Sequence, residues 1–230
     1  MEEHSLALSF GNSLTEDIAG IVGDYAELGL DALVEEGLFK DIPLVSTAVA
    51  VYRIGKSIHE RHHVAKLISF LDEINKGIAD EENRQKYQEK FASNEKFRNQ
   101  ELEYILILID RYVSFDKPQM LAKLYLAYLD GEIIWEEFTM YAEVIDRFLL
   151  LDCSNLISCD GKTTVYRNIG GESVLRLVAL GLMAETNENS LFEARHGGIG
   201  MTSASIERFQ SNSKTYRRTE FGEKLANILR

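Results

Sequence analysis

The chain has 230 residues, 45% of them hydrophobic and 27% charged, which is enough apolar material for one large or two small domains and not the composition of a disordered protein. Its 25 basic and 37 acidic residues give a net charge of −12, which argues against a surface wholly devoted to nucleic acid or anionic lipid. Only two prolines occur, so we expect long helices.

The first helices are predicted from their end signals. An S-x-x-E capping box at Ser13 predicts a helix start, and Gly37 predicts its end. Pro43 suits the first turn of a second helix, which we expect to run from Leu44 to Asn75, to be closed by Gly77 and to be the longest element.

Four more helices are predicted before residue 152. The run Tyr104 to Ile109 is apolar enough for a strand, but no turn residue flanks it, so we expect a helix. Asp130-Gly131 predicts a turn between two of the helices. The expected helices are Glu81 to Ala92, Asn94 to Ile109, Leu121 to Leu129 and Trp135 to Leu151.

The charge of the chain changes after these helices. Residues 1–159 hold 15 basic and 29 acidic residues, a net charge of −14, whereas residues 160–230 hold 10 and 8, a net charge of +2. Glycine and serine also become frequent, which predicts turns and strands. We therefore expect a helical body over residues 1–151 and a second module over residues 152–230.

The sharpest motif is the H-E-x-x-H sequence from His59 to His63, which on a helix places two histidines on one face and suits a zinc hydrolase. A helical wheel puts both on a flank with Lys56 and Lys66, which predicts a solvated basic face. The spacer contains charged Arg61, and no convincing third ligand follows. We expect no metal here, and a zinc-dependent hydrolase stays an alternative.

The segment from Asp130 to Phe138 is similar to the second half of an EF-hand loop. The first and third loop positions would be Leu126 and Tyr128, which offer no carboxylate to calcium. We expect a turn between two helices instead, with Ile133 and Phe138 packed beneath the second. The two cysteines, Cys153 and Cys159, are too few for a disulfide scaffold and lack C-x-x-C spacing, so we expect both to be reduced.

The last 60 residues carry two helix signals. Glu172 to Leu180 reads as a helix ended by Gly181, and Tyr216-Arg-x-Thr219 precedes a closing helix. This pairing resembles the end of many winged-helix domains. The resemblance implies a basic wing able to contact DNA, and its basic residues here would be Arg208, Lys214, Arg217 and Arg218.

The helix expected at 172–180 nevertheless holds a single basic residue, Arg176, and no cluster suited to base edges. We therefore expect no sequence-specific DNA binding, and DNA-binding regulation stays an alternative. Association with a protein partner or a second copy is expected instead, through those of the following residues that are not core: Leu175, Leu177, Leu180, Leu182 and Met183.

Small residues mark the N-terminal helices, among them Gly20, Gly23 and Gly29. Such faces suit close helix packing, which we expect, and also segments that insert into membranes. A membrane-perturbing effector therefore stays an alternative. Its contact with lipid, or with a partner, would use the basic residues of the second helix: Arg53, Lys56, Arg61 and Lys66.

A further pattern, Tyr52-x-x-Gly55-x-Ser-Ile58-x-x-Arg61 followed by Lys66-Leu-x-x-Phe70, resembles a group of uncharacterised bacterial proteins from variable genome regions, over residues 36–151. The resemblance implies a bacterial origin and a role in conflict with mobile elements or phages, and it implies no activity.

Taken together, these features predict a mainly α protein, with a multi-helix body and a small C-terminal α+β module of winged-helix type. We expect a non-enzymatic interaction or regulatory protein without a cofactor. Met1-Glu2-Glu3-His4 lacks the basic start of a secretory signal, and no apolar stretch approaches the ~20 residues that span a bilayer, so a cytoplasmic location is expected.

Overall fold

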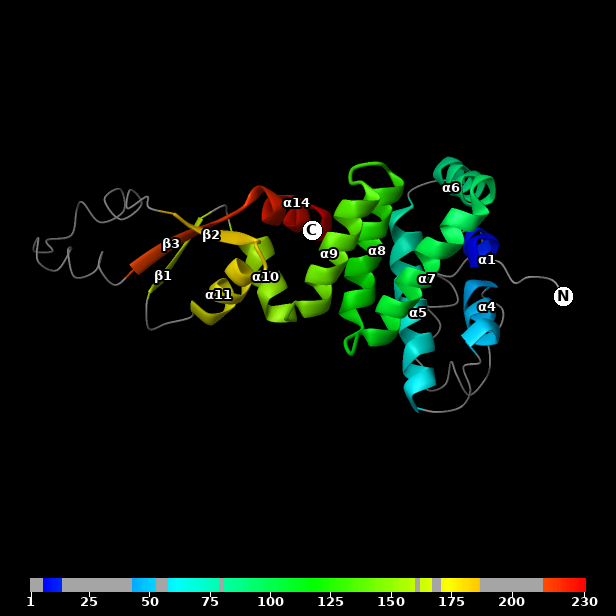
Figure 1. The fold of residues 1–230 in the computed structure, drawn as a ribbon, viewed down its shortest axis with the longest axis horizontal. Helices are drawn as coiled ribbons and strands as arrows, with labels where there is room; N and C mark the ends of the chain where they lie inside the picture. Colours follow the sequence, from blue (N-terminus) through cyan, green and yellow to red (C-terminus); the bar gives the residue numbers. More distant parts are fainter. Residues whose placement is uncertain are drawn as a thin grey trace, which may run out of the picture. The chain divides into compact units, whose positions relative to one another are not determined.

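The computed structural model describes residues 6–13, 43–52, 58–78, 81–159, 162–166, 171–186 and 213–230. For residues 48–52, 58–61, 81, 162–166 and 213 the description is limited to the backbone. The described chain is mostly helical, with one small antiparallel sheet near its C-terminal end (Figure 1). It divides into two compact units, residues 1–146 and residues 147–230. The boundary predicted after Leu151 falls inside a helix of the second unit.

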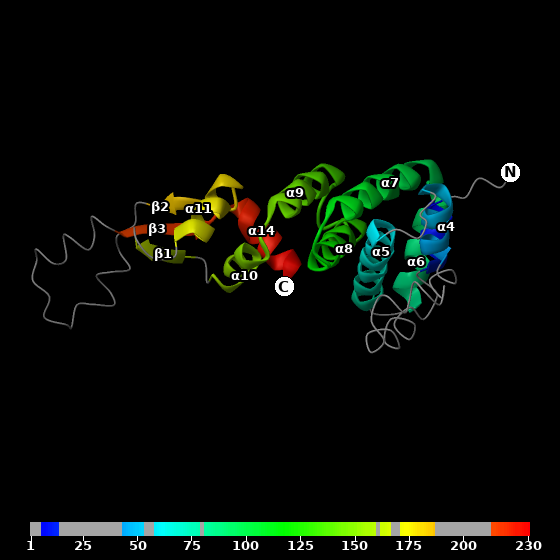
Figure 2. The same cartoon turned by 90° about the horizontal axis from the view of Figure 1, so that it is seen from below.

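The first unit is helical throughout its described part. Helix α5 packs against α8 and α7, and α1 lies against α4, α6 and α7 (Figures 1 and 2). The helices are α1 (Leu6–Ser13), α4 (Pro43–Tyr52), α5 (Ile58–Gly77), α6 (Glu81–Ser93), α7 (Glu95–Arg111), α8 (Asp116–Leu129) and α9 (Trp135–Arg147). None of the described helices is both long and apolar enough to cross a membrane.

An aromatic cluster fills the core of this unit. Phe10 of α1 lies 4.7 Å, between ring centroids, from Phe91 of α6 and 6.0 Å from Tyr125 of α8. Tyr125 also contacts Phe138 of α9 at 5.7 Å and Phe70 of α5 at 6.4 Å. All five side chains are fully buried, so one cluster joins five helices.

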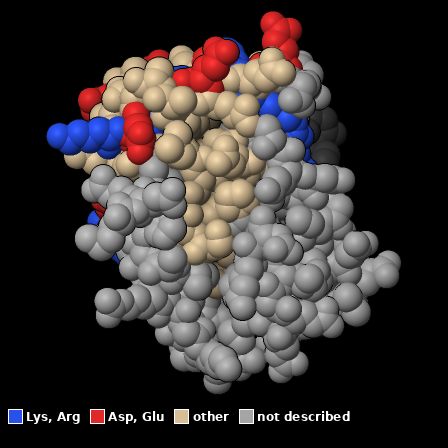
Figure 3. Space-filling view, turned by 90° about the vertical axis from the view of Figure 1, so that its right-hand side faces the viewer, with Lys and Arg blue, Asp and Glu red and all other residues tan. Residues whose placement is uncertain are grey.

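One face of this unit has an uncharged area. In the described part of the view in Figure 3, the charged side chains lie toward the top and the middle is uncharged. Helices α1 and α4 contain no charged residue, which fits that uncharged area.

Ser13, from which a helix was predicted, is the last residue of α1. Its hydroxyl donates to the Ser9 carbonyl at 2.9 Å and accepts from the backbone N–H of Leu44, also at 2.9 Å. Ser13 therefore caps α4, a helix that starts 30 residues later at Pro43. The rest of the predicted helix, to Gly37, lies outside the described residues.

The predicted helix from Leu44 to Asn75 is described as α4 and α5, with residues 53–57 outside the description. Its predicted end at Gly77 is confirmed, but for a different reason. Gly77 does not have a positive φ. A Cβ at this position would lie 2.2 Å from Leu126 Cδ1, so the glycine allows α5 to approach α8 closely.

The predicted helix through Tyr104 to Ile109 is confirmed as part of α7, and the turn at Gly131 has a φ of 81°. The single helix predicted from Trp135 to Leu151 is wrong, because α9 ends at Arg147 and Leu149 is extended. No proline or glycine marks this break. The Leu149 carbonyl accepts the first-turn N–H groups of the next helix, so no side-chain signal is needed.

The second unit combines helices with a three-stranded sheet. Its elements are α10 (Leu150–Ser158), β1 (Lys162–Tyr166), α11 (Gly171–Ala179), β2 (Met183–Thr186), β3 (Ser213–Arg218) and α14 (Glu220–Leu229). The strand order is β1-β3-β2 and both pairings are antiparallel. Helix α11 contacts β1 and β2, and α14 contacts β3 (Figure 2).

The predicted helix ends of this unit are confirmed. Gly181 follows α11 with a φ of 74°, and Thr219 caps α14 by accepting from the Gly222 N–H at 3.0 Å. The Thr219 hydroxyl also donates to the Gly181 carbonyl at 2.7 Å. A Cβ on Gly222 would lie 2.0 Å from the Leu182 carbonyl oxygen, so α14 can dock here only with glycine at that position.

Candidate functional site

The predicted solvated basic face of α5 is wrong for the residues whose side chains are described. Lys66 is only 2% exposed, and His63 is also buried. The Lys66 Nζ donates to the carbonyls of Asp110 at 2.8 Å and Tyr112 at 2.6 Å, at the end of α7. Burial lowers the pKa of Lys66, although the charge of Asp110 acts in the opposite direction. Lys66 therefore caps a helix and is not available to a partner.

The neighbouring histidines contact the same part of the chain. His63 Nδ1 lies 3.2 Å from Asp110 Oδ1, and His62 Nε2 lies 2.9 Å from the Val113 carbonyl oxygen. The His62 ring packs edge-on against Phe115, with centroids 4.6 Å apart. The described histidines of α5 thus hold the connection between α7 and α8.

The other residues of the zinc motif and of the basic flank are less fully described. His59 and Arg61 lie in α5 without described side chains, and Arg53 and Lys56 lie outside the described residues. Within the described part of the chain, no three His, Cys, Asp or Glu residues form a group able to hold a metal ion.

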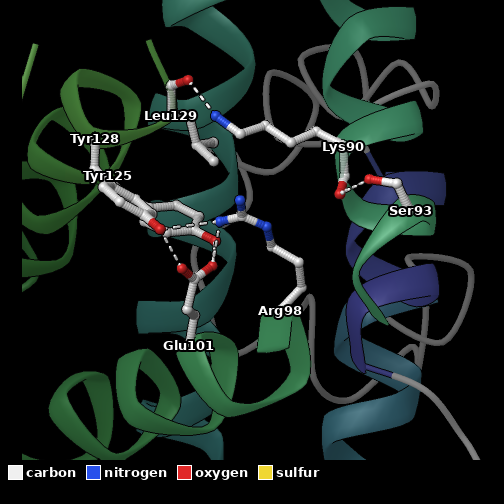
Figure 4. Close-up of polar contacts among 7 residues, drawn as sticks. All are labelled: Lys90, Ser93, Arg98, Glu101, Tyr125, Tyr128 and Leu129. Carbon is white, nitrogen blue, oxygen red and sulfur yellow. Dashed lines mark hydrogen bonds and ion pairs between the residues drawn. The ribbon is translucent and has the colours of Figure 1, made fainter. Parts of the chain in front are cut away.

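A buried polar network, which the sequence did not reveal, joins α7 to α8 (Figure 4). Arg98 donates to Glu101 Oε2 at 2.5 Å. Tyr125 donates to the same oxygen at 3.3 Å, and Tyr128 donates to Glu101 Oε1. In sequence, Arg98 and Glu101 look like an ordinary surface pair on one helix, three residues apart. Their burial is set by α8, which no local signal reports.

The network is nearly saturated with internal partners. Burial raises the pKa of Tyr125 and Tyr128, and the adjacent Glu101 raises both further. The Arg98 guanidinium also lies over the Phe91 ring, 5.6 Å from its centroid. These groups serve the core of the first unit, and they present no reactive group to a substrate.

The glutamate that matches the last EF-hand position has a structural role. Glu137 Oε2 accepts the backbone N–H of Ile134 at 3.1 Å, at the start of α9. Ile133 and Phe138 are buried, as predicted for a turn between two helices. Cys153 is buried and Cys159 is half-buried.

In the second unit, the single basic residue of α11 is held by a carboxylate. Arg176 donates from Nε and Nη2 to the two oxygens of Asp152 on α10, at 2.8 and 2.7 Å. These hydrogen bonds lower the pKa of Asp152, which is almost fully buried. The pair fixes α11 against α10, and the Nε and Nη2 donors of Arg176 are both used in it.

The predicted wing residues differ in their surroundings. Lys214 pairs with Glu185 at 2.7 Å. Arg218 is buried, where it pairs with Glu223 at 2.6 Å and donates to the Leu156 carbonyl at 3.2 Å. Arg217 is exposed and makes no ion pair in the described part of the chain. Arg208 lies outside the described residues.

The residues predicted to serve association also separate into two groups. Leu177, Leu182 and Met183 are buried in the core of the second unit, whereas Leu175 is 57% exposed and Leu180 is half-buried. The exposed positions of α11 are Glu172, Leu175 and Ala179. This helix therefore presents an acidic and apolar surface.

The strongest candidate site is thus β3 of the second unit, where Arg217 is exposed and its neighbours Lys214 and Arg218 are paired with carboxylates. The chain matches no family model, no curated protein and no solved structure. The resemblances to winged-helix domains and to bacterial proteins of variable genome regions therefore stay predictions.

Proposed function

We propose that the chain is an interaction or regulatory protein without catalytic activity, and that residues 147–230 bind a protein partner and not DNA. The observation that carries this proposal is the pairing of Arg176, Lys214 and Arg218 with carboxylates of the same unit. A nucleic-acid site needs basic side chains that are free to neutralise phosphates, so this pattern favours a protein partner.

The winged-helix reading belongs to the same proposal. A strand, a helix, two further strands and a closing helix, with the strand order β1-β3-β2, are typical of such modules. In a DNA-binding member, α11 would occupy the major groove. Its exposed Glu172 would repel phosphates and its exposed Leu175 reads no base edge, which supports a winged-helix-like module used for protein contacts.

The test is binding of the full chain to a fluorescein-labelled, mixed-sequence duplex, followed by anisotropy at low and at physiological salt. We expect no saturable binding at physiological salt. Saturable binding that survives unlabelled competitor, falls steeply with salt and is lost in Arg217→Glu would overturn the proposal. The matched control is Arg230→Glu, which makes the same charge change on an exposed residue at the end of the chain.

A further inference from the structure

One face of the sheet carries a basic row and a hydroxyl row. Lys162 of β1 and Ala184 of β2 both stand opposite Arg217 of β3. In the next row on the same face, Thr164 and Thr186 both stand opposite Thr215. Because residues two apart along a strand share a face, we define the outer sheet face by these six residues: Lys162, Thr164, Ala184, Thr186, Thr215 and Arg217.

The opposite face of the sheet belongs to the core. Met183, Tyr216 and Arg218 alternate with the residues of the outer sheet face, and all three are buried. Arg217 and Ala184 are exposed, and Thr186 and Thr215 are half-buried. The outer sheet face is therefore the side on which Arg217 is accessible.

The charges of the two faces are balanced differently. On the inner face, Lys214 of β3 is paired with Glu185 of β2. On the outer sheet face, the register places a second basic residue, Lys162, opposite Arg217. Two basic residues in register on one face favour an anionic ligand, and a carboxylate is the anion that proteins carry.

The hydroxyl row adds hydrogen-bonding capacity beside the basic pair. The Thr186 hydroxyl is shielded from solvent and has no hydrogen-bond partner among the described residues, whereas Thr215 is half-buried and is the hydroxyl of this row that a ligand would meet first. Threonine hydroxyls donate to carboxylate oxygens, and the planar guanidinium of arginine matches a carboxylate with two parallel hydrogen bonds. The row and the basic pair together suit a short acidic segment crossing the strands.

We propose that the outer sheet face binds an acidic segment of a protein partner, with Arg217 as its main contact. The inference rests on the proposed function and names the chemistry of the partner. A nucleic acid is disfavoured, because it presents phosphates along its whole length to a face on which the register places two basic residues.

The experiment uses the full chain and a fluorescein-labelled 12-residue peptide of alternating Glu and Ser, with a Gln and Ser peptide as the uncharged probe. We expect saturable binding of the acidic peptide only. Arg217→Gln and Lys162→Gln should each weaken it about fivefold, the upper range of one exposed ion pair. Lys214→Gln removes the same charge from the inner face of the same strand, and it should change the affinity less than about twofold.

A second variant tests the face without removing a basic residue. Ala184→Glu places a carboxylate in register with Arg217, so it should occupy the arginine and weaken peptide binding at least as much as Arg217→Gln does. Ala179→Glu makes the same change at an exposed position of α11 and should leave binding intact. Circular dichroism checks that each variant keeps the helical content of the parent.

Four results would overturn the inference. Equal losses in Arg217→Gln and Lys214→Gln would mean that only the general charge of the chain matters. If neither the peptide nor the duplex binds, the acidic-segment inference is wrong and the proposed function is not contradicted. Duplex binding lost in Arg217→Gln would remove both, and self-association lost in the same variant would assign the face to a second copy.

Discussion

Lys66 in the first unit and Arg217 in the second show how differently two basic residues of similar appearance in the sequence are used. Lys66 is buried, and its ammonium group donates hydrogen bonds to two carbonyls at the end of α7. Arg217 is exposed on a sheet face and opposes another basic residue in register. The comparison teaches that the backbone groups around a charged residue decide its role. Which backbone groups lie nearby depends on the packing of distant segments and cannot be read from the sequence around the residue.

Pairs of one cation with one carboxylate occur in both units, as in Arg111 with Asp146 and Arg176 with Asp152. The first unit also contains a network between α7 and α8, in which buried Glu101 accepts from Arg98, Tyr125 and half-buried Tyr128 (Figure 4). We therefore expect charge substitutions in the first unit to act on stability, and those on the outer sheet face to act on binding.

The largest effect is expected from Glu101→Ala, which leaves Arg98 buried without its carboxylate. Breaking a buried ion pair in this way costs about 3–5 kcal/mol of unfolding free energy. Urea unfolding followed by the fluorescence of Trp135, the single tryptophan, reports on the first unit. The control Glu103→Ala, at an exposed position of the same helix, should cost less than about 0.5 kcal/mol. Equal losses of stability in Glu101→Ala and Glu103→Ala would mean that Arg98 does not depend on Glu101 for a buried partner.

A smaller effect is expected from Gly222→Ala, which directs a methyl group at the Leu182 carbonyl. Backbone cannot give way as a side chain does, so we expect a loss of about 2–3 kcal/mol in the second unit. Hydrogen exchange of the amides in α14 and β3 measures this loss of stability. Gly77→Ala meets only the end of the Leu126 side chain and should cost less in the first unit. The reverse order would contradict the packing described for α14.

Lys66→Met should lower the stability of the first unit by about 1–3 kcal/mol, because two carbonyls at the end of α7 lose their donor. The same urea experiment with Trp135 fluorescence applies. Lys96→Met is the matched control, since Lys96 is exposed on α7 and its loss should cost less than about 0.5 kcal/mol. A neutral result for Lys66→Met would place that residue at the surface after all.

The smallest effect concerns the acid sensitivity of the second unit. The hydrogen bonds from Arg176 lower the pKa of Asp152 below its ordinary value of 3.8, so the pair stabilises the folded state above that pH. This stability is lost as the pH falls through 3.8 toward the lower folded-state pKa. Hydrogen exchange in α11, measured between pH 5 and pH 3 and corrected for the intrinsic exchange rate, should show the loss in the parent and not in Asp152→Asn. An identical pH dependence in both would contradict it.

The parts of the fold that could be predicted depend on local signals. Thr219 accepts from an N–H three residues later, and Gly181 takes the left-handed conformation that ends α11, so both were readable from short stretches. Ser13 and Lys66 could not be placed in this way. Each satisfies backbone groups of another helix, and their partners follow from packing and not from periodicity.

The candidate site was readable only in part. Arg217 was among the residues predicted for a partner surface, but so were Lys66 and Arg218, which are buried. The register of β1 with β3 separates them, because it joins Lys162 and Arg217 across a long stretch of sequence. Alternation along a single strand shows which residues share a face, and it does not show which residue stands opposite.

The most direct test compares Lys66→Met and Arg217→Gln in one titration series with the acidic peptide, alongside their urea unfolding curves. We predict that Arg217→Gln lowers the peptide affinity about fivefold and leaves the unfolding curve unchanged. Lys66→Met should do the opposite, lowering stability and leaving the affinity of the folded protein unchanged. Loss of peptide affinity in Lys66→Met, or an Arg217→Gln variant that binds as tightly as the parent, would contradict the division between a structural and a binding cation.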